Sequence, residues 1–261
     1  LVNAGSAYVF GPSGIGDESL QELRPAAGYT AAGDFFGCAV AVDYLGSTGS
    51  GIVGAYKHDY SGIPQKIDAG IAFLYSSTDW SSGSSEPTFV LENPEADRAS
   101  FDYFGYDVAI GQSSQGMSAL IGAPRANVTG SDSGAVFWAS SASNSDVTIQ
   151  RLQLERSDYF GSDAPGPLSY CGQAVSMCIS GDQPWAAMGA PGHDEGSDYN
   201  AGIVYTLQKT RGPVINPGGL RLNPHLIRNP SPNLFKQFGR SVDLYDDGGV
   251  PYLIIGALIR Q

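Results

Sequence analysis

The sequence predicts an all-β fold, and three observations lead to this prediction. Glycine and proline are abundant, at 35 and 16 of 261 residues, whereas only 15% of the residues are charged. The chain also has 14 tyrosines and 11 phenylalanines, and aromatic residues favour strands. Short stretches in which small and large apolar residues alternate recur along the chain, with turn-forming residues between them. This combination is typical of many short strands joined by tight turns.

One sequence unit occurs four times, with a period of 67 or 68 residues. Each copy opens on an aromatic residue or a cysteine followed by glycine, and a Gly-Ala pair follows at a fixed distance. Chance does not keep this spacing constant over four copies, so the copies are repeats of one structural unit. From opening residue to glycine, 18 positions apart in each case, the spans are Phe36 to Gly54, Phe104 to Gly122, Cys171 to Gly189 and Phe238 to Gly256.

Each unit contains four predicted strands. The first follows the opening, as in "CAVAVD", and the second ends at the Gly-Ala pair. The third begins with glycine, as in "AGIAFLY" from Ala69, and the fourth is more polar, as in "PTFVLEN" from Pro87. The stretch "SDYFGSDAP" from Ser157 imitates an opening, but we interpret it as a loop insertion. One aromatic residue recurs in the third strand, where we expect it in the core: Tyr8, Phe73, Phe137 and Tyr205.

Four short strands in a period of this size predict a β-propeller blade. We therefore interpret residues 1–261 as a single β-propeller domain of four-stranded blades, with residues 1–10 completing a blade. Two arrangements remain open: a closed four-bladed ring, in which the two ends share one blade, or a segment of a larger propeller. The absence of an initiator methionine suggests a piece of a longer precursor. The repeat cores cover about 36–75, 104–138, 171–207 and 238–261.

The order of Phe-Gly, valine-rich strand, Gly-Ala-Pro and Gly-aromatic strand resembles the FG-GAP repeat of integrin α-chain propellers. The resemblance covers nearly the whole chain and is closest to the variety without a calcium loop. It implies a propeller, usually of seven blades, in a secreted or cell-surface protein. Calcium-binding copies carry alternating aspartates between the first two strands, and here only Asp243, Asp246 and Asp247 approach that pattern. We therefore expect no cofactor, with these aspartates as weak calcium candidates.

Charge, hydropathy and cysteine content exclude several classes of partner. The net charge of -12 repels phosphate backbones, so we expect no nucleic acid partner. No apolar run approaches the roughly 18 residues that span a bilayer, so we expect no membrane span in this chain. The cysteines, Cys38, Cys171 and Cys178, show no zinc-binding spacing, and we expect them to be buried free thiols.

Two loops carry the residues that most resemble a polar site. His58-Asp59 and His193-Asp194 occupy equivalent places, each histidine four positions after the glycine of a Gly-Ala pair. Repeats inherit the same loop, so a structural role explains both pairs better than catalysis does. We treat these four residues as candidate binding residues, together with Glu195 and Asp198 in the same acidic loop.

No nucleophile elbow, zinc-protease motif, P-loop or dinucleotide motif occurs in the sequence. We therefore expect a non-catalytic extracellular or cell-surface module for protein-protein contacts or structural assembly. The candidate surface is the loops at 56–68, 124–132 and 192–200. Asn127-Val128-Thr129 is an N-glycosylation triplet in the second of these loops, with Asn127 as the acceptor.

Two alternative functions remain. A carbohydrate-binding, lectin-like propeller would have a glycan as its partner, and its polar-aromatic pockets should recur from blade to blade. An accessory domain of an extracellular enzyme would have one site that occurs once. A protein-binding scaffold needs neither, so repetition of a pocket discriminates among the three.

Overall fold

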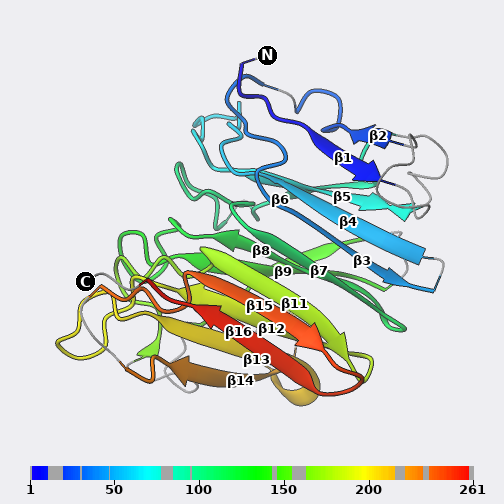
Figure 1. The fold of residues 1–261 in the computed structure, drawn as a ribbon. Coiled ribbons are helices and arrows are strands. Elements are labelled where there is room, and N and C mark those ends of the chain that lie inside the picture. Colours follow the sequence, from blue (N-terminus) through cyan, green and yellow to red (C-terminus); the bar gives the residue numbers. More distant parts are fainter. Residues whose placement is uncertain are drawn as a thin grey trace.

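The computed structural model describes residues 2–10, 20–29, 31–46, 48–77, 85–94, 96–142, 146–154, 163–214, 221–231 and 235–258. Within these residues the named elements are all strands, and they form five antiparallel sheets (Figure 1). The predicted all-β class is confirmed. Most of the stretch that imitates an opening, from Ser157, lies outside the described residues.

Three of the sheets have four strands each, in the order of the chain, and each matches one predicted unit. The first contains β3 (Val40–Leu45), β4 (Thr48–Ala55), β5 (Ile71–Ser76) and β6 (Phe89–Glu92). The second contains β7 (Val108–Ser113), β8 (Gly116–Ala123), β9 (Ala135–Ser141) and β10 (Thr148–Arg151). The third contains β11 (Ala174–Ser180), β12 (Gln183–Ala190), β13 (Ile203–Val214) and β14 (Arg221–Arg228). The two-stranded sheets are β1 (Ala7–Phe10) with β2 (Leu20–Leu23), and β15 (Ser241–Asp246) with β16 (Pro251–Gly256).

The repeated glycines determine how one sheet docks on the next. Gly70 has a φ of 86° and forms a parallel bridge with Phe104, the opening residue of the following unit. A Cβ at Gly70 would lie 2.1 Å from the Phe104 carbonyl oxygen, so only glycine permits this approach. The same bridge joins the other pairs of consecutive units: Gly5 to Phe36, Gly134 to Cys171, and Gly202 to Phe238.

The sheets follow one another in a row, from β1–β2 at the top of Figure 1 to β15–β16 in front of the third four-stranded sheet. Their first strands pack in series, with β3 on β7, β7 on β11 and β11 on β15. The core lies between consecutive sheets. Phe104 and Phe137 are fully buried there, with ring centroids 5.1 Å apart in an edge-to-face arrangement.

The two-stranded sheets carry exposed apolar side chains. The structure describes no hydrogen bonding between β1–β2 and β15–β16, and the row of sheets does not close on itself. Phe73, Phe137 and Tyr205 are fully buried, as expected, but Tyr8 is 50% exposed. The prediction that Tyr8 lies in the core is wrong in this structure because no second strand pairs with β1 on its free edge.

The three cysteines are free, and their burial differs from the expectation. Cys171 is fully buried, whereas Cys178 is half-buried and Cys38 is exposed. The expectation of buried residues is therefore wrong for Cys38 and Cys178, although burial around the Cys38 thiol raises its pKa. Cys38 precedes β3, which packs on β7 but on no first strand of a preceding unit in the described part of the chain. No helix in the described part of the chain is long and apolar enough to cross a membrane.

Candidate binding site

The three predicted surface loops lie at one end of the sheets. Because neighbouring strands are antiparallel, the loops between second and third strands share this end with the openings of the units. We call this end the loop face. It comprises residues 56–70, 124–134 and 191–202 and the openings at 35–38, 103–106, 170–173 and 237–240. The turns between first and second strands, such as 114–115, lie at the other end, which we call the turn face.

The residue directly before each opening has a strained backbone. Left-handed φ values are uncommon for bulky residues, and each such residue costs on the order of 1–3 kcal/mol. The strain lets the chain bury the opening residue, for example Phe104, while the preceding side chain stays half-buried on the loop face. Such strain concentrates at functional sites. The four residues and their φ values are Phe35 at 57°, Tyr103 at 60°, Tyr170 at 52° and Gln237 at 50°.

Aromatic rings fill the junction between the first two four-stranded sheets. Tyr56, which follows the first Gly-Ala pair, lies edge-to-face against Tyr103 and Tyr106, at centroid distances of 5.1 and 5.3 Å. Tyr103 and Tyr106 are themselves nearly parallel, with an interplanar angle of 11°. Phe35 extends the row, at 5.7 Å from Tyr56, and Lys57 places its ammonium 5.2 Å from the Phe35 ring. This arrangement is an aromatic surface with a cation at its rim.

Over the next two junctions the loop face opens into a cavity of about 270 Å³. Pro124 follows the second Gly-Ala pair, at the position that Tyr56 has in the first unit, so no aromatic ring from this position fills the space. We call this cavity the tyrosine–arginine pocket. The side chains that characterise its lining are Tyr103, Tyr106, Arg125, Tyr170, Gln173 and Arg240.

The two arginines of the pocket differ in their partners. Arg125 donates to Asp132 at 3.1 Å and to the Tyr103 hydroxyl at 3.4 Å. The hydrogen bond that Arg125 donates to Asp132, followed by the one that it donates to Tyr103, raises the pKa of Arg125, so the guanidinium stays charged. Arg240 donates to the Gln237 side chain at 3.3 Å and forms no ion pair with any residue that the structure describes.

In the predicted pair His58-Asp59, the two side chains have different hydrogen-bond partners. The His58 ring is buried, and its Nδ1 lies 3.1 Å from the Asp34 carboxylate. Asp59 instead accepts a hydrogen bond from the backbone N–H of Asp68 at 2.7 Å, which closes the loop. Asp34 also accepts the backbone N–H of Ala31 at 2.9 Å. The interactions of this pair hold the loop and the neighbouring turn in place.

The second predicted pair has a similar local role. His193 is buried, and burial lowers its pKa, which favours the neutral ring. Asp194 accepts the backbone N–H of Asn200 at 2.8 Å, as Asp59 does in the first unit. Glu195 lies 3.3 Å from Arg228. Asp198 and Glu195 form a two-residue backbone bridge. Each of these contacts stabilises the loop.

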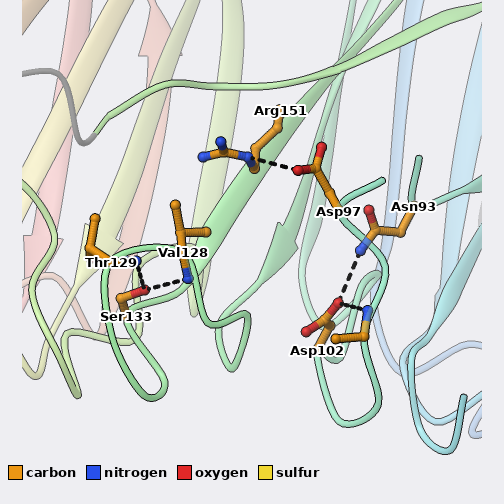
Figure 2. Close-up of polar contacts among 8 residues, drawn as sticks. Asn93, Asp97, Asp102, Val128, Thr129, Ser133 and Arg151 are labelled. Carbon is orange, nitrogen blue, oxygen red and sulfur yellow. Dashed lines mark hydrogen bonds and ion pairs between the residues drawn. The ribbon is translucent and has the colours of Figure 1, made fainter. Parts of the chain in front are cut away.

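In the second unit Asp102 has no histidine partner (Figure 2). Ala126 occupies the position of His58, and Asp102 lies beside a cavity of about 340 Å³. Asp102 is 1% exposed, and it accepts hydrogen bonds from the Ala99 backbone at 2.6 Å and the Asn93 side chain at 3.2 Å. Burial raises the pKa of Asp102 to about 6. The Asn93 Oδ1 is buried without a hydrogen-bond partner.

The weak calcium candidates lie at the turn face, around β15 and β16. Asp243 accepts from the Ser176 hydroxyl at 3.3 Å, and Asp246 accepts the Gly249 backbone N–H at 3.0 Å. Asp247 donates its backbone N–H to Val250 at 3.2 Å. Across the described ranges, no three His, Cys, Asp or Glu side chains are grouped so that they could hold a metal ion.

Asn127 is exposed on the loop face. Its Oδ1 accepts the backbone N–H of Asp132 at 2.8 Å. Figure 2 shows Val128 and Thr129, the other residues of the triplet, donating their backbone N–H groups to Ser133. Glycosylation of Asn127 remains a prediction.

The fold and the loop face define a repeat protein of four-stranded antiparallel sheets. The model of the FG-GAP repeat family matches residues 95–138, which include β7, β8 and most of β9. Residues 95–138 are therefore an FG-GAP repeat, a domain type typical of propeller modules. The comparison with curated proteins gives no match.

Proposed function

We propose that this chain is a non-catalytic propeller module of an extracellular or cell-surface protein and that it holds a protein partner on its loop face. The tyrosine–arginine pocket, beside the aromatic row of the half-buried Tyr56 and Tyr103 and the exposed Tyr106, is the observation that carries this proposal. Tyrosine and arginine are enriched in protein interfaces and at their energetic hot spots.

Hydrogen bonds within the loops, from backbone to side chain, support a binding role. In each of the three loops one side chain accepts a backbone N–H from the same loop: Asp59 from Asp68, Asn127 from Asp132, and Asp194 from Asn200. Loops that are held in one conformation lose less entropy when a partner binds. Rigid sheets that carry loops held by such hydrogen bonds are suited to recognising a partner protein.

The chemistry of the pocket favours binding over catalysis. Among the described residues, the lining has no carboxylate, histidine, serine or cysteine that could act as a nucleophile or general base. The histidine with a carboxylate partner, His58, lies in the interior and bonds Asp34. The pocket also does not recur at the previous junction, where Tyr56 fills the space. A lectin-like propeller, whose pockets recur, is therefore the weaker candidate.

We propose that the sheets are blades and that the two-stranded sheets are complementary halves of one blade. β15–β16 has the place of the first and second strands, and β1–β2 that of the third and fourth. By the register of the complete sheets, where Val53 pairs with Phe73, Ile255 of β16 would pair with Tyr8 of β1. The exposed side chains of Val40, Val42 and Ile254 support coverage by further strands. A larger propeller, with more blades between these halves, is the alternative.

The experiment that tests the proposed function compares two faces of the same molecule. Proteins on intact cells or in secreted fractions are captured with the parent chain and identified. Arginine replaces the exposed Ser61 and Ser197 on the loop face in one variant, and the exposed Gln115 on the turn face in the other. We expect Ser61→Arg/Ser197→Arg to lose the partner and Gln115→Arg to keep it. Equal capture by both variants would contradict the proposal.

A further inference from the structure

The first junction shows what the hollow between two openings accommodates. The Tyr56 ring lies against Tyr103 and Tyr106 with interplanar angles of 79° and 73°, so it is nearly perpendicular to both rings. This edge-to-face contact is the preferred geometry of aromatic pairs. Tyr56 therefore shows that in this fold a phenol ring fits the space beside Tyr103 and Tyr106, the residues before and after the Phe-Gly of the next opening.

The second junction has the same hollow without the ring. Pro124 stands in place of Tyr56, and the residues equivalent to Tyr103 and Tyr106 are Tyr170 and Gln173. The cavity of about 270 Å³ extends from this junction over the next one, where Pro191 stands in place of Tyr56 and Arg240 in place of Tyr106. Tyr103 and Tyr106 also line it. This volume is slightly below the range of about 300–1,000 Å³ for small-molecule pockets, so a single side chain is a suitable occupant.

The charge of the pocket is opposite to that of the whole chain. The net charge is -12, yet the described lining residues include the guanidinium groups of Arg125 and Arg240 and no carboxylate. Asp132 compensates Arg125, whereas Arg240 has no ion-pair partner in the described part of the chain. Guanidinium groups form their strongest hydrogen bonds with carboxylates. The pocket therefore favours an anionic group over a cationic one.

We infer that the tyrosine–arginine pocket binds an aromatic side chain of a protein partner that has a carboxylate next to the ring. The ring takes the place that Tyr56 has at the first junction, against Tyr170, and the carboxylate pairs with Arg240. This inference rests on the proposed function and names the chemistry of the partner at that site.

The probe is 4-hydroxyphenylacetate, which combines a phenol ring with a carboxylate, and its neutral counterpart is 4-hydroxyphenylethanol. Titration is followed by calorimetry or by protein NMR. We expect saturable binding of the acid, about threefold to fivefold tighter than that of the alcohol, because one partly exposed charge pair distinguishes them. The absence of saturation up to about 20 mM, or equal affinity for both probes, would overturn the inference.

Two variants and one control locate the binding. Pro124→Tyr places in the pocket the residue that the first unit has there, and we expect it to abolish probe binding. Arg240→Gln should remove the preference for the acid, about threefold to fivefold. Arg24→Gln changes an exposed arginine that pairs with Glu22 outside the loop face, and it should leave the affinity unchanged. Thermal melting verifies that each variant folds, and unchanged binding in a folded Arg240→Gln would refute the site.

The outcomes separate this inference from the proposed function. If the probe does not bind but loop-face substitutions still abolish partner capture, the pocket assignment is wrong and the proposed function stands. If the probe binds as expected but capture is equal for the loop-face and turn-face variants, the proposed function is wrong, and with it the assignment of the occupant to a protein.

Discussion

Replacing Asp102 by asparagine should stabilise the protein at neutral pH and should make its stability less dependent on pH. Asp102 is almost fully buried, and burial raises its pKa to about 6, whereas an aspartate in an unfolded chain titrates near 3.9. Between these values the folded state binds the proton more strongly than the unfolded state. The contribution of Asp102 to stability is therefore fully present below about pH 4 and is lost as the pH rises through about 6.

The magnitude follows from the shift in pKa. A rise of about two units corresponds to about 3 kcal/mol of unfolding free energy in total, of which about 2 kcal/mol is lost between pH 4 and pH 7. Asparagine retains an oxygen that can accept the Ala99 N–H, and it does not ionise. The difference in unfolding free energy, Asp102→Asn minus parent, should therefore increase by about 2 kcal/mol from pH 4 to pH 7.

The assay is urea denaturation of both proteins at a series of pH values, followed by circular dichroism. The control is Asp97→Asn, which removes a nearby, partly exposed carboxylate that pairs with Arg151 at 3.4 Å. Its difference from the parent should change by less than about 1 kcal/mol over the same range. A difference for Asp102→Asn that stays flat or decreases with pH would refute the assignment of a proton to buried Asp102.

Three further predictions concern the repeat, the ends of the row of sheets and the glycosylation triplet. Gly70→Ala should lower the unfolding free energy by more than about 2 kcal/mol, because its Cβ would meet the Phe104 carbonyl oxygen. The control Gly62→Ala, whose Cβ would meet nothing within 4 Å, should lower it by less than about 1 kcal/mol. Equal denaturation midpoints for the two variants would contradict the importance of the Gly70–Phe104 bridge. Tyr8→Cys/Ile255→Cys should form an intramolecular disulfide, detected by mass spectrometry of the monomer, if the two half-sheets share one blade; cysteines that stay free in the oxidised monomer would exclude this closure. Expression in a secreting eukaryotic cell should give a glycan mass that Asn127→Gln removes, and identical masses would contradict the prediction.

The strands and their order were predictable because the signals are local. Each Gly-Ala pair and each opening mark a close backbone approach, which the residue type alone reveals. The bridge of Gly70 to Phe104 is an example, since a Cβ at that glycine would meet the carbonyl oxygen of Phe104. Repetition then supplied the pairing of strands, which a single unit would have left ambiguous. Tyr8 was wrongly predicted to lie in the core, because the repeat pattern assumes that every third strand pairs with a second strand, and β1 has no such partner in this structure.

The tyrosine–arginine pocket was not predictable because it depends on proline in the place of the Tyr56 ring and on the backbone conformation of the residues before each opening. The sequence shows Tyr103 and Tyr170 before their openings, but it does not reveal that their left-handed backbones hold the rings half-buried on the loop face. It also did not indicate that proline in place of Tyr56 would open a cavity. The signal that could have found it was a comparison of the residues after each Gly-Ala pair.

The partners of the histidines were also missed. Sequence proximity suggested His58 with Asp59, whereas the structure pairs His58 with Asp34, which lies 24 positions away. The equivalent positions hold Asp34 with His58, Asp102 with Ala126, and Ser169 with His193. Tabulating these positions across the repeats would have indicated that Asp102 lacks its partner, although its raised pKa required the burial seen in the structure.

Site-directed photo-cross-linking tests most directly the claim that partners bind the loop face. A photoreactive amino acid is placed at the exposed Ser61 or Ser197 on the loop face, and at the exposed Gln115 on the turn face, and each protein is irradiated on intact cells. The account predicts the same cross-linked partner from positions 61 and 197 and none from position 115. Cross-links that form from position 115 alone, or no cross-links from either loop position, would contradict it.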